Sequence, residues 1–274
     1  MEFQILNNTT MRSFFRYSSF LAFVSMFTVA CTEVIDIDLN KTDPKLVIQA
    51  EVSTAPGPYY VKINQTVNFD TTNDFPPISN ATVIISDDAG NIETLNNLGN
   101  GNYSTNALQG VLGRTYTLEV IQNGNNYTAV STIPSNEIMI DTIIPFDSPF
   151  GSDTTKFLIP IYKDPSGIDN YYRFKQTVNG IANKNILLLE DRDNDGNYNT
   201  RPLFGSDVKP GDDVTLEIQG IDKGVYTYLS GFLNFSGGFN ASASPANPTS
   251  NIIGTNVLGF FSAHTSSSKH VVVQ

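Results

Sequence analysis

The chain has 274 residues and carries 27 acidic against 16 basic residues, which gives a formal net charge of −11 at pH 7. This balance argues against nucleic acid as a partner, because phosphate recognition needs clustered Lys and Arg. It also provides no polybasic patch for anionic lipids. A single cysteine, Cys31, excludes a disulfide within the chain, so an apolar core must hold the fold together.

The first 30 residues have the layout of a secretory signal peptide. Arg12 and Arg16 precede an apolar stretch over residues 20–30, which is too short to span a bilayer and ends in small residues. We therefore expect residues 1–30 to be removed from the mature protein.

The single cysteine directly follows that apolar stretch. Residues 28–31 (TVAC) resemble a bacterial lipobox, at which a signal peptidase cleaves before a cysteine that carries a diacylglycerol. In this interpretation Cys31 becomes an acylated N-terminus, residues 31–43 form a lipidated tether, and the membrane is an attachment surface. The alternative is that Cys31 is a small buried hydrophobe, a common fate of an unpaired cysteine.

Residues 44–140 show the pattern of an Ig-like β-sandwich domain. Two runs rich in alternating apolar and polar residues, 46–53 and 59–67, flank a Pro-Gly-Pro turn at residues 56–58. Further on, Asp-Ala-Gly at residues 88–90 marks a hairpin, and glycines closely followed by a tyrosine begin the next strands. Strands that recur at intervals of about 8 to 12 residues are typical of a β-sandwich.

Residues 141–274 are expected to form a second, C-terminal β-rich domain. One segment, residues 226–235, is predicted to be a helix because its apolar residues fall on one face, although a strand is the alternative. The fold is therefore predicted to be all-β and mainly antiparallel, with at most one short helix. The main strands of this part are predicted at residues 156–162, 171–180, 209–221 and 252–264.

After Cys31 a series of motifs follows in a specific order: VIDIDL (34–39), LVIQAEV (46–52), ATVIISDDAG (81–90), GRTYTLEV (113–120), NYYRF (170–174), DRDNDGN (191–197), KPGDDVTLEI (209–218) and NPTSNIIGTNVLGFFSA (247–263). In this order the motifs resemble the Bacteroidetes lipoproteins that carry the uncharacterised domain DUF4249. The resemblance extends over essentially the whole mature chain, and it implies an N-terminal sandwich of the prealbumin-like type.

The resemblance also implies a location and a partner. Members of this family are typically outer-membrane lipoproteins encoded near TonB-dependent receptors, and no reaction is established for them. Glu33 is similar to the acidic signal that directs such lipoproteins to the cell surface. We therefore expect a lipid-anchored outer-membrane protein that is a non-enzymatic accessory or ligand-binding subunit of a TonB-dependent receptor. The alternative is an adhesion or cell-envelope structural lipoprotein.

An acidic loop in the C-terminal half has the spacing of a calcium-binding loop. Oxygen-bearing side chains alternate, and Gly196 stands at the sixth place, where a tight turn is needed. Pro202 occupies the twelfth place, where an EF-hand has a glutamate, so an EF-hand is excluded. A solvated hairpin turn is the alternative. The predicted Ca²⁺ ligands are Asp191, Asp193, Asp195 and Asn199.

The sequence gives little support for an enzyme. The two histidines, His264 and His270, lie in a Ser-rich run near the C-terminus that we expect to be a mobile tail. A nucleophile needs a base that a third group holds in place, and a mobile tail provides no such order. We therefore predict no catalytic residues.

Two further sets of residues are candidates for a surface role. Asp-Thr-Thr or Asp-Thr-Ile sequences resemble sites at which Bacteroidetes O-glycosylate exported proteins, and they point to Thr71, Thr142 and Thr154. Adjacent aromatic residues occur as Tyr59/Tyr60, Tyr171/Tyr172 and Phe260/Phe261. In a strand the two members of each pair face opposite sides, so we expect one in a core and the other in a satellite cluster or at an interface.

Overall fold

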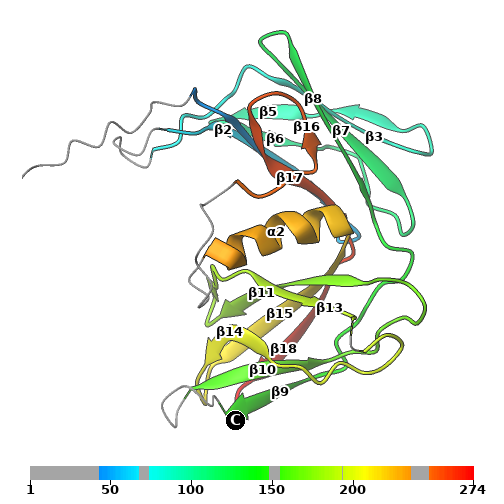
Figure 1. Cartoon of the computed structure of the whole chain (residues 1–274), viewed down its shortest axis with the longest axis vertical. Helices are drawn as coiled ribbons and strands as arrows, with labels where there is room; N and C mark the ends of the chain where they lie inside the picture. The colour runs from blue at the N-terminus through cyan, green and yellow to red at the C-terminus, as the bar shows by residue number, and fades with distance from the viewer. Residues whose placement is uncertain (1–42, 68–73, 148–154, 193, 236–246) are drawn as a thin grey trace, which may run out of the picture. The chain divides into compact units, whose positions relative to one another are not determined.

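The described part of the chain consists of four β-sheets and a helix (Figure 1). The computed structural model describes residues 43–67, 74–147, 155–192, 194–235 and 247–274. The all-β prediction with at most one short helix is confirmed. The helix within these residues is not long and apolar enough to traverse a bilayer. The predicted positions that lie outside the described residues are the signal peptide, residues 31–42 of the tether with Cys31 and Glu33, and also Thr71, Thr154 and Asp193.

The first sheet joins strands from the beginning and the end of the described chain. Along its strand β1 the buried and less buried residues alternate, as the period of two in a strand requires. One face of β1 therefore enters a core, and the other face is left for a site. The strand order is β17 (Val257–His264), β1 (Leu46–Ser53), β2 (Tyr60–Gln65), β6 (Asn102–Ser104) and β5 (Asn96–Gly99).

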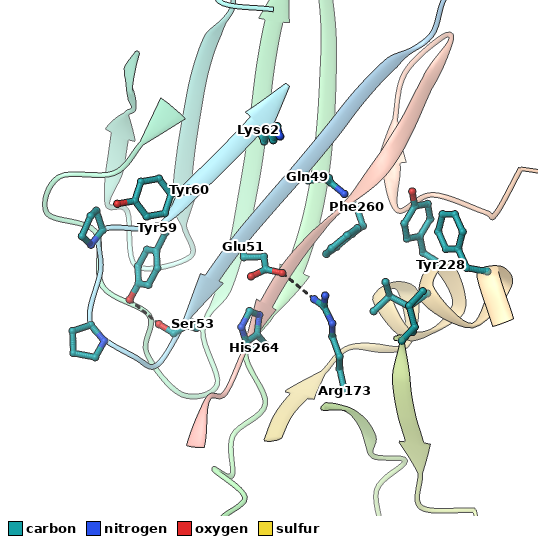
Figure 2. Close-up of a pocket in the computed structure, with 15 residues that line it drawn as sticks. Gln49, Glu51, Ser53, Tyr59, Tyr60, Lys62, Arg173, Tyr228, Phe260 and His264 are labelled. Atoms are coloured by element: carbon teal, nitrogen blue, oxygen red, sulfur yellow. Dashed lines mark hydrogen bonds and ion pairs between the residues drawn. The ribbon is translucent and has the colours of Figure 1, made fainter. Parts of the chain in front are cut away.

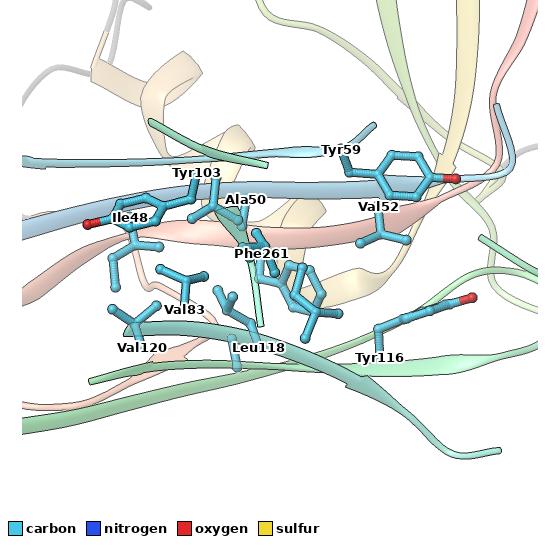
Figure 3. Close-up of a cluster of buried hydrophobic side chains, with 14 of the residues drawn as sticks. Ile48, Ala50, Val52, Tyr59, Val83, Tyr103, Tyr116, Leu118, Val120 and Phe261 are labelled. Carbon is cyan, nitrogen blue, oxygen red and sulfur yellow. The ribbon is translucent and has the colours of Figure 1, made fainter. Parts of the chain in front are cut away.

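A second sheet covers the inner face of the first and completes a β-sandwich. Its strand order is β16 (Ile252–Ile253), β8 (Asn125–Thr132), β7 (Thr115–Gln122), β3 (Thr82–Asp87) and β4 (Ile92–Thr94). Between the two sheets lies one apolar cluster, to which both contribute fully buried side chains (Figure 3). Examples from the first sheet are Ile48 and Phe261, and examples from the second are Leu118 and Val120.

The strand β17 reaches this sandwich from far along the chain. It pairs in parallel with β1, from Leu46 opposite Val257 to Ser53 opposite His264, and β16 pairs with β8. The sequence prediction assigns these residues to the second domain, whereas the structure places them in the sandwich, and residues 42–274 form one compact unit. Gly259 permits the pairing. Its φ is +110°, and a Cβ there would lie 1.8 Å from the Ile48 carbonyl oxygen.

Two further sheets enclose a second apolar core. One has the order β12 (Ile181–Ala182), β11 (Tyr171–Val178), β15 (Asp213–Ile221) and β18 (Ser267–Val272), with β13 (Leu187–Glu190) also paired to β11. The other has the order β14 (Leu203–Val208), β10 (Lys156–Ile161) and β9 (Thr142–Asp147). Their shared core contains Leu158, Tyr172, Phe174 and Leu216.

The helix α2 (Lys223–Phe235) contacts β17 of the first sandwich and β11 of the second group of sheets. Val225, Tyr228 and Leu229 bury its apolar face against Phe260. The prediction of a helix over residues 226–235 is confirmed, and the helix begins three residues earlier. Asp222 caps its N-terminus, because the Asp222 Oδ1 atom accepts a hydrogen bond of 2.9 Å from the Val225 backbone N–H.

Candidate functional site

A cleft of about 650 Å³ opens between the outer face of the first sheet and the helix α2 with β11 (Figure 2). Its floor is made by side chains of β1 and β17 that alternate with the core residues. The polar residues of this floor are Gln49, Glu51, Ser53 and His264, and Arg173 reaches it from β11. The alternation that builds the sandwich core thus also brings these groups together on the opposite face of the same strands.

An ion-pair cluster crosses the cleft. The Arg173 Nη1 atom lies 2.9 Å from Glu51 Oε1, and the Lys175 Nζ atom lies 2.8 Å from Glu51 Oε2. Each carboxylate oxygen therefore accepts a charge-assisted hydrogen bond from a different side chain of β11. The cluster attaches the first sandwich to the second group of sheets.

Two pKa values are strongly lowered at the floor of the cleft. Burial would raise the pKa of Glu51, but the charges of Lys175, His264 and Arg173 outweigh it and lower the pKa to about 2. For His264 burial dominates and lowers the pKa to about 4, although Glu51 and Glu217 oppose this shift. At neutral pH Glu51 is therefore ionised and His264 is neutral.

Both histidines have ordered positions, so the prediction of a mobile tail is wrong. His264 ends β17 and is 2% exposed, and its Nδ1 atom lies 3.0 Å from Ser262 Oγ. His270 lies in β18, where its Nε2 atom is 2.9 Å from Asp213 Oδ1. The Ser-rich composition suggested mobility, but pairing of β18 with β15 orders the segment.

Ser262 is 1% exposed and does not line the cleft, so its hydroxyl is not presented to a bound molecule.

Aromatic side chains form the walls of the cleft. The Arg173 guanidinium carbon lies 5.8 Å from the centroid of the Phe260 ring, within the range of a cation–π contact. Tyr228 packs against Phe260, with ring centroids 5.4 Å apart. Tyr60 lies on β2 and is 57% exposed. Its core-facing neighbour Tyr59 is buried, so this aromatic pair separates as a strand requires.

The site also contains a cation that is open to a bound molecule. Lys62 lines the cleft beside Tyr60, is exposed, and forms no ion pair with any residue that the structure describes. A cleft with an apolar aromatic wall and a few polar groups at fixed positions is suited to binding.

A comparison with family models identifies the family of the chain. The model of DUF4249, a domain of unknown function, matches residues 32–270 of the chain. The chain belongs to the DUF4249 family. A comparison with curated proteins finds no significant match. In this DUF4249 protein the motifs LVIQAEV and NVLGFFSA correspond to β1 and most of β17, the two strands that form the floor of the cleft.

The predicted calcium loop lies away from the cleft, among the second group of sheets. Asp191 and Asp195 are brought together there with Asp164, which the sequence prediction did not include. Asp164 follows β10 in the Asp-Pro-Ser-Gly segment of residues 164–167, and only the fold places it beside the loop. The Asn199 amide donates hydrogen bonds to the carbonyl oxygens of Pro160 and Arg201, which assigns it a structural role.

One of the predicted glycosylation positions falls within the described residues. Thr142 begins β9 and is exposed, so its hydroxyl is accessible to a modifying enzyme. Glycosylation of Thr142 stays a prediction.

Proposed function

We propose that this DUF4249 protein is a lipid-anchored outer-membrane protein that serves as a non-enzymatic, partner- or ligand-binding accessory of a TonB-dependent receptor. The observation that supports a binding role is the cleft, which is lined by the exposed Tyr60 and Lys62 and by the Phe260 and Tyr228 rings. The family match supports the placement of the anchor, because the matched residues begin directly after Cys31.

The composition of the cleft favours an occupant with an apolar surface and an anionic group. Phe260 and Tyr228 offer aromatic area, and Lys62 offers a cation within a protein of net charge −11. Glu51 does not offset Lys62, because Arg173 and Lys175 hold its carboxylate. Exposed aromatic side chains such as Tyr60 are enriched among the anchors of protein-binding surfaces.

The experiment that tests this proposal is a pull-down of the tagged protein from native outer membranes in mild detergent, followed by mass spectrometry. A TonB-dependent receptor recovered in stoichiometric amount is the expected result. Recovery of the protein without a receptor would overturn the accessory role and favour the adhesion or cell-envelope alternative.

Two variants connect that result to the cleft. Tyr60→Ala removes an exposed aromatic from the cleft, and Phe204→Ala removes one that is 61% exposed on β14 and does not line the cleft. Loss of one interface anchor worth about 1.4 kcal/mol weakens binding about tenfold, so receptor recovery should fall for Tyr60→Ala only. Equal recovery with both variants would show that the receptor binds elsewhere.

A further inference from the structure

Two loops of the second group of sheets meet and bring three carboxylates together. One loop follows β10 and contains Asp164, and the other follows β13 and contains Asp191 and Asp195. Each carboxylate offers an oxygen, and these oxygens lie within 4.8 Å of one another. A backbone hydrogen bond of 3.0 Å from Asp164 N–H to the Asn197 carbonyl joins the two loops.

A glycine allows the loops to approach this closely. Gly196 has a φ of +72°, and a Cβ at this position would lie 2.7 Å from the Ser166 side chain. The sequence motif placed a glycine here for a tight turn, and the structure adds that the glycine makes room for the other loop. The loop thus has a shape that is set by contacts as well as by its own sequence.

The carboxylates are held by hydrogen-bond donors, and two of the three keep an oxygen that accepts no hydrogen bond from the described residues. Asp191 Oδ2 accepts from the Asn170 N–H at 2.9 Å, and Asp195 Oδ1 accepts from the Gly167 N–H at 2.7 Å. The other oxygens, Asp191 Oδ1 and Asp195 Oδ2, accept no hydrogen bond from the residues that the structure describes. Asp164 is oriented by the Tyr172 hydroxyl and by the Gly196 N–H. Each side chain is therefore fixed before any ligand arrives.

A buried hydroxyl gives an independent sign that a ligand belongs here. Tyr162 is fully buried, and its hydroxyl has no hydrogen-bond partner among the described residues. The Tyr162 ring packs against Tyr172, with ring centroids 5.0 Å apart, and the Tyr172 hydroxyl donates a hydrogen bond to Asp164, so the phenol lies beside this cluster. A buried polar group without a partner is costly and points to an ion or water at that position.

The charges of the cluster favour a divalent cation. Asp164 and Asp191 are 1% and 7% exposed, so their mutual repulsion is poorly screened by solvent. The Arg201 guanidinium also acts on Tyr162 and offsets part of the negative charge, while its Nη2 atom is held by Asn194 Oδ1. Three carboxylates and one guanidinium leave two negative charges to be neutralised.

We propose that Asp164, Asp191 and Asp195 bind a calcium ion, with water completing the coordination. Carboxylate oxygens are the ligands that this hard cation prefers, and its flexible coordination suits a site built from two loops. Mg²⁺ demands a stricter octahedral arrangement and is expected to bind more weakly. This site is separate from the cleft, so it does not depend on the proposed accessory function.

The test uses the purified protein after treatment with EDTA. Thermal unfolding and isothermal calorimetry are followed as CaCl₂ is added from about 10 μM to 10 mM, a range that covers sensor-type and extracellular calcium sites. The expected result is a measurable heat of binding and a Tm that rises with calcium concentration, because calcium binds the folded state. MgCl₂ and matched NaCl control for general screening of the net negative charge.

The matched variants are Asp195→Asn and Asp207→Asn. Asparagine can still accept the hydrogen bond from Gly167, so Asp195→Asn removes a charge with little change to the loop. Asp207 is exposed on β14 and does not belong to the cluster. Calcium affinity should fall at least about tenfold in Asp195→Asn and stay unchanged in Asp207→Asn. An absence of any calcium response in the wild type, or equal responses of the two variants, would overturn the proposal.

Discussion

The Arg173 guanidinium lies 2.9 Å from the Glu51 carboxylate, although 122 positions separate the two residues in the sequence. This contact joins β11 to β1 and therefore attaches the second group of sheets to the sandwich. Lys175 binds the other oxygen of the same carboxylate at 2.8 Å. Glu51 is the shared partner, so the stability of this junction depends on it.

Replacement of Glu51 by Gln is expected to destabilise the fold, because Arg173 and Lys175 would face each other without a counter-charge. The cluster is partly exposed, so we expect a loss of about 1 to 2 kcal/mol, between the values for exposed and for buried pairs. Urea unfolding of Glu51→Gln, Lys175→Met and the double variant measures the coupling. Additive effects of the two single changes would contradict the cluster.

The stability of the protein is expected to fall in two steps as the medium is acidified. The pKa of His264 is about 4 in the folded state against 6.5 when unfolded, so the unfolded chain binds the proton first and stability is lost between pH 6.5 and 4. A difference of this size corresponds to at most about 3 kcal/mol. The pKa of Glu51 is about 2 in the folded state against 4.5 when unfolded, so stability falls further as the pH drops below 4.5.

A His264→Gln variant separates the two steps. Glutamine does not titrate, so the loss between pH 6.5 and 4 should disappear. The loss at lower pH should shrink only in part, because Lys175 and Arg173 still lower the pKa of Glu51 when the His264 charge is removed. The measurement is the free energy of unfolding by urea at intervals from pH 8 to pH 3. An unchanged pH profile in the variant would show that His264 does not control the first step.

Gly259→Ala is expected to disrupt the pairing of β17 with β1. The new Cβ would lie 1.8 Å from the Ile48 carbonyl oxygen, and the φ of +110° is strained for any other residue. A loss of more than about 3 kcal/mol is expected, because the strand must move. Gly124→Ala is a useful control, since its φ is also positive but no atom lies within 4 Å of the added Cβ. Thermal unfolding of the two variants should differ clearly.

Replacement of Cys31 by Ser tests the proposed lipid anchor. Serine cannot form the thioether to diacylglycerol, so the variant should leave the membrane fraction and lose the acyl mass. Fractionation and intact-mass spectrometry of the wild type and Cys31→Ser measure both effects. A wild-type protein of unmodified mass would contradict the anchor.

The sequence by itself predicted the elements whose signal is local. The alternation of apolar and polar residues over 46–53 predicted β1 and its two faces, and the one-sided apolar pattern of residues 226–235 predicted α2. The alternating oxygen-bearing side chains of residues 191–199 likewise predicted Asp191 and Asp195 as metal ligands. Each of these signals is read within a dozen neighbouring residues, because side-chain direction in a strand or helix follows directly from position.

Only the tertiary structure decided which distant segments meet. Strand β17 shows an apolar pattern that fits many partners, and its parallel pairing with β1 depends on the shared core and on Gly259. In the same way Arg173 meets Glu51, and Asp164 joins Asp191, through the stacking of sheets. Bringing distant strands together costs the entropy of closing the long loops between them, and no single contact offsets that cost. The pairing of distant strands therefore depends on the whole packed core.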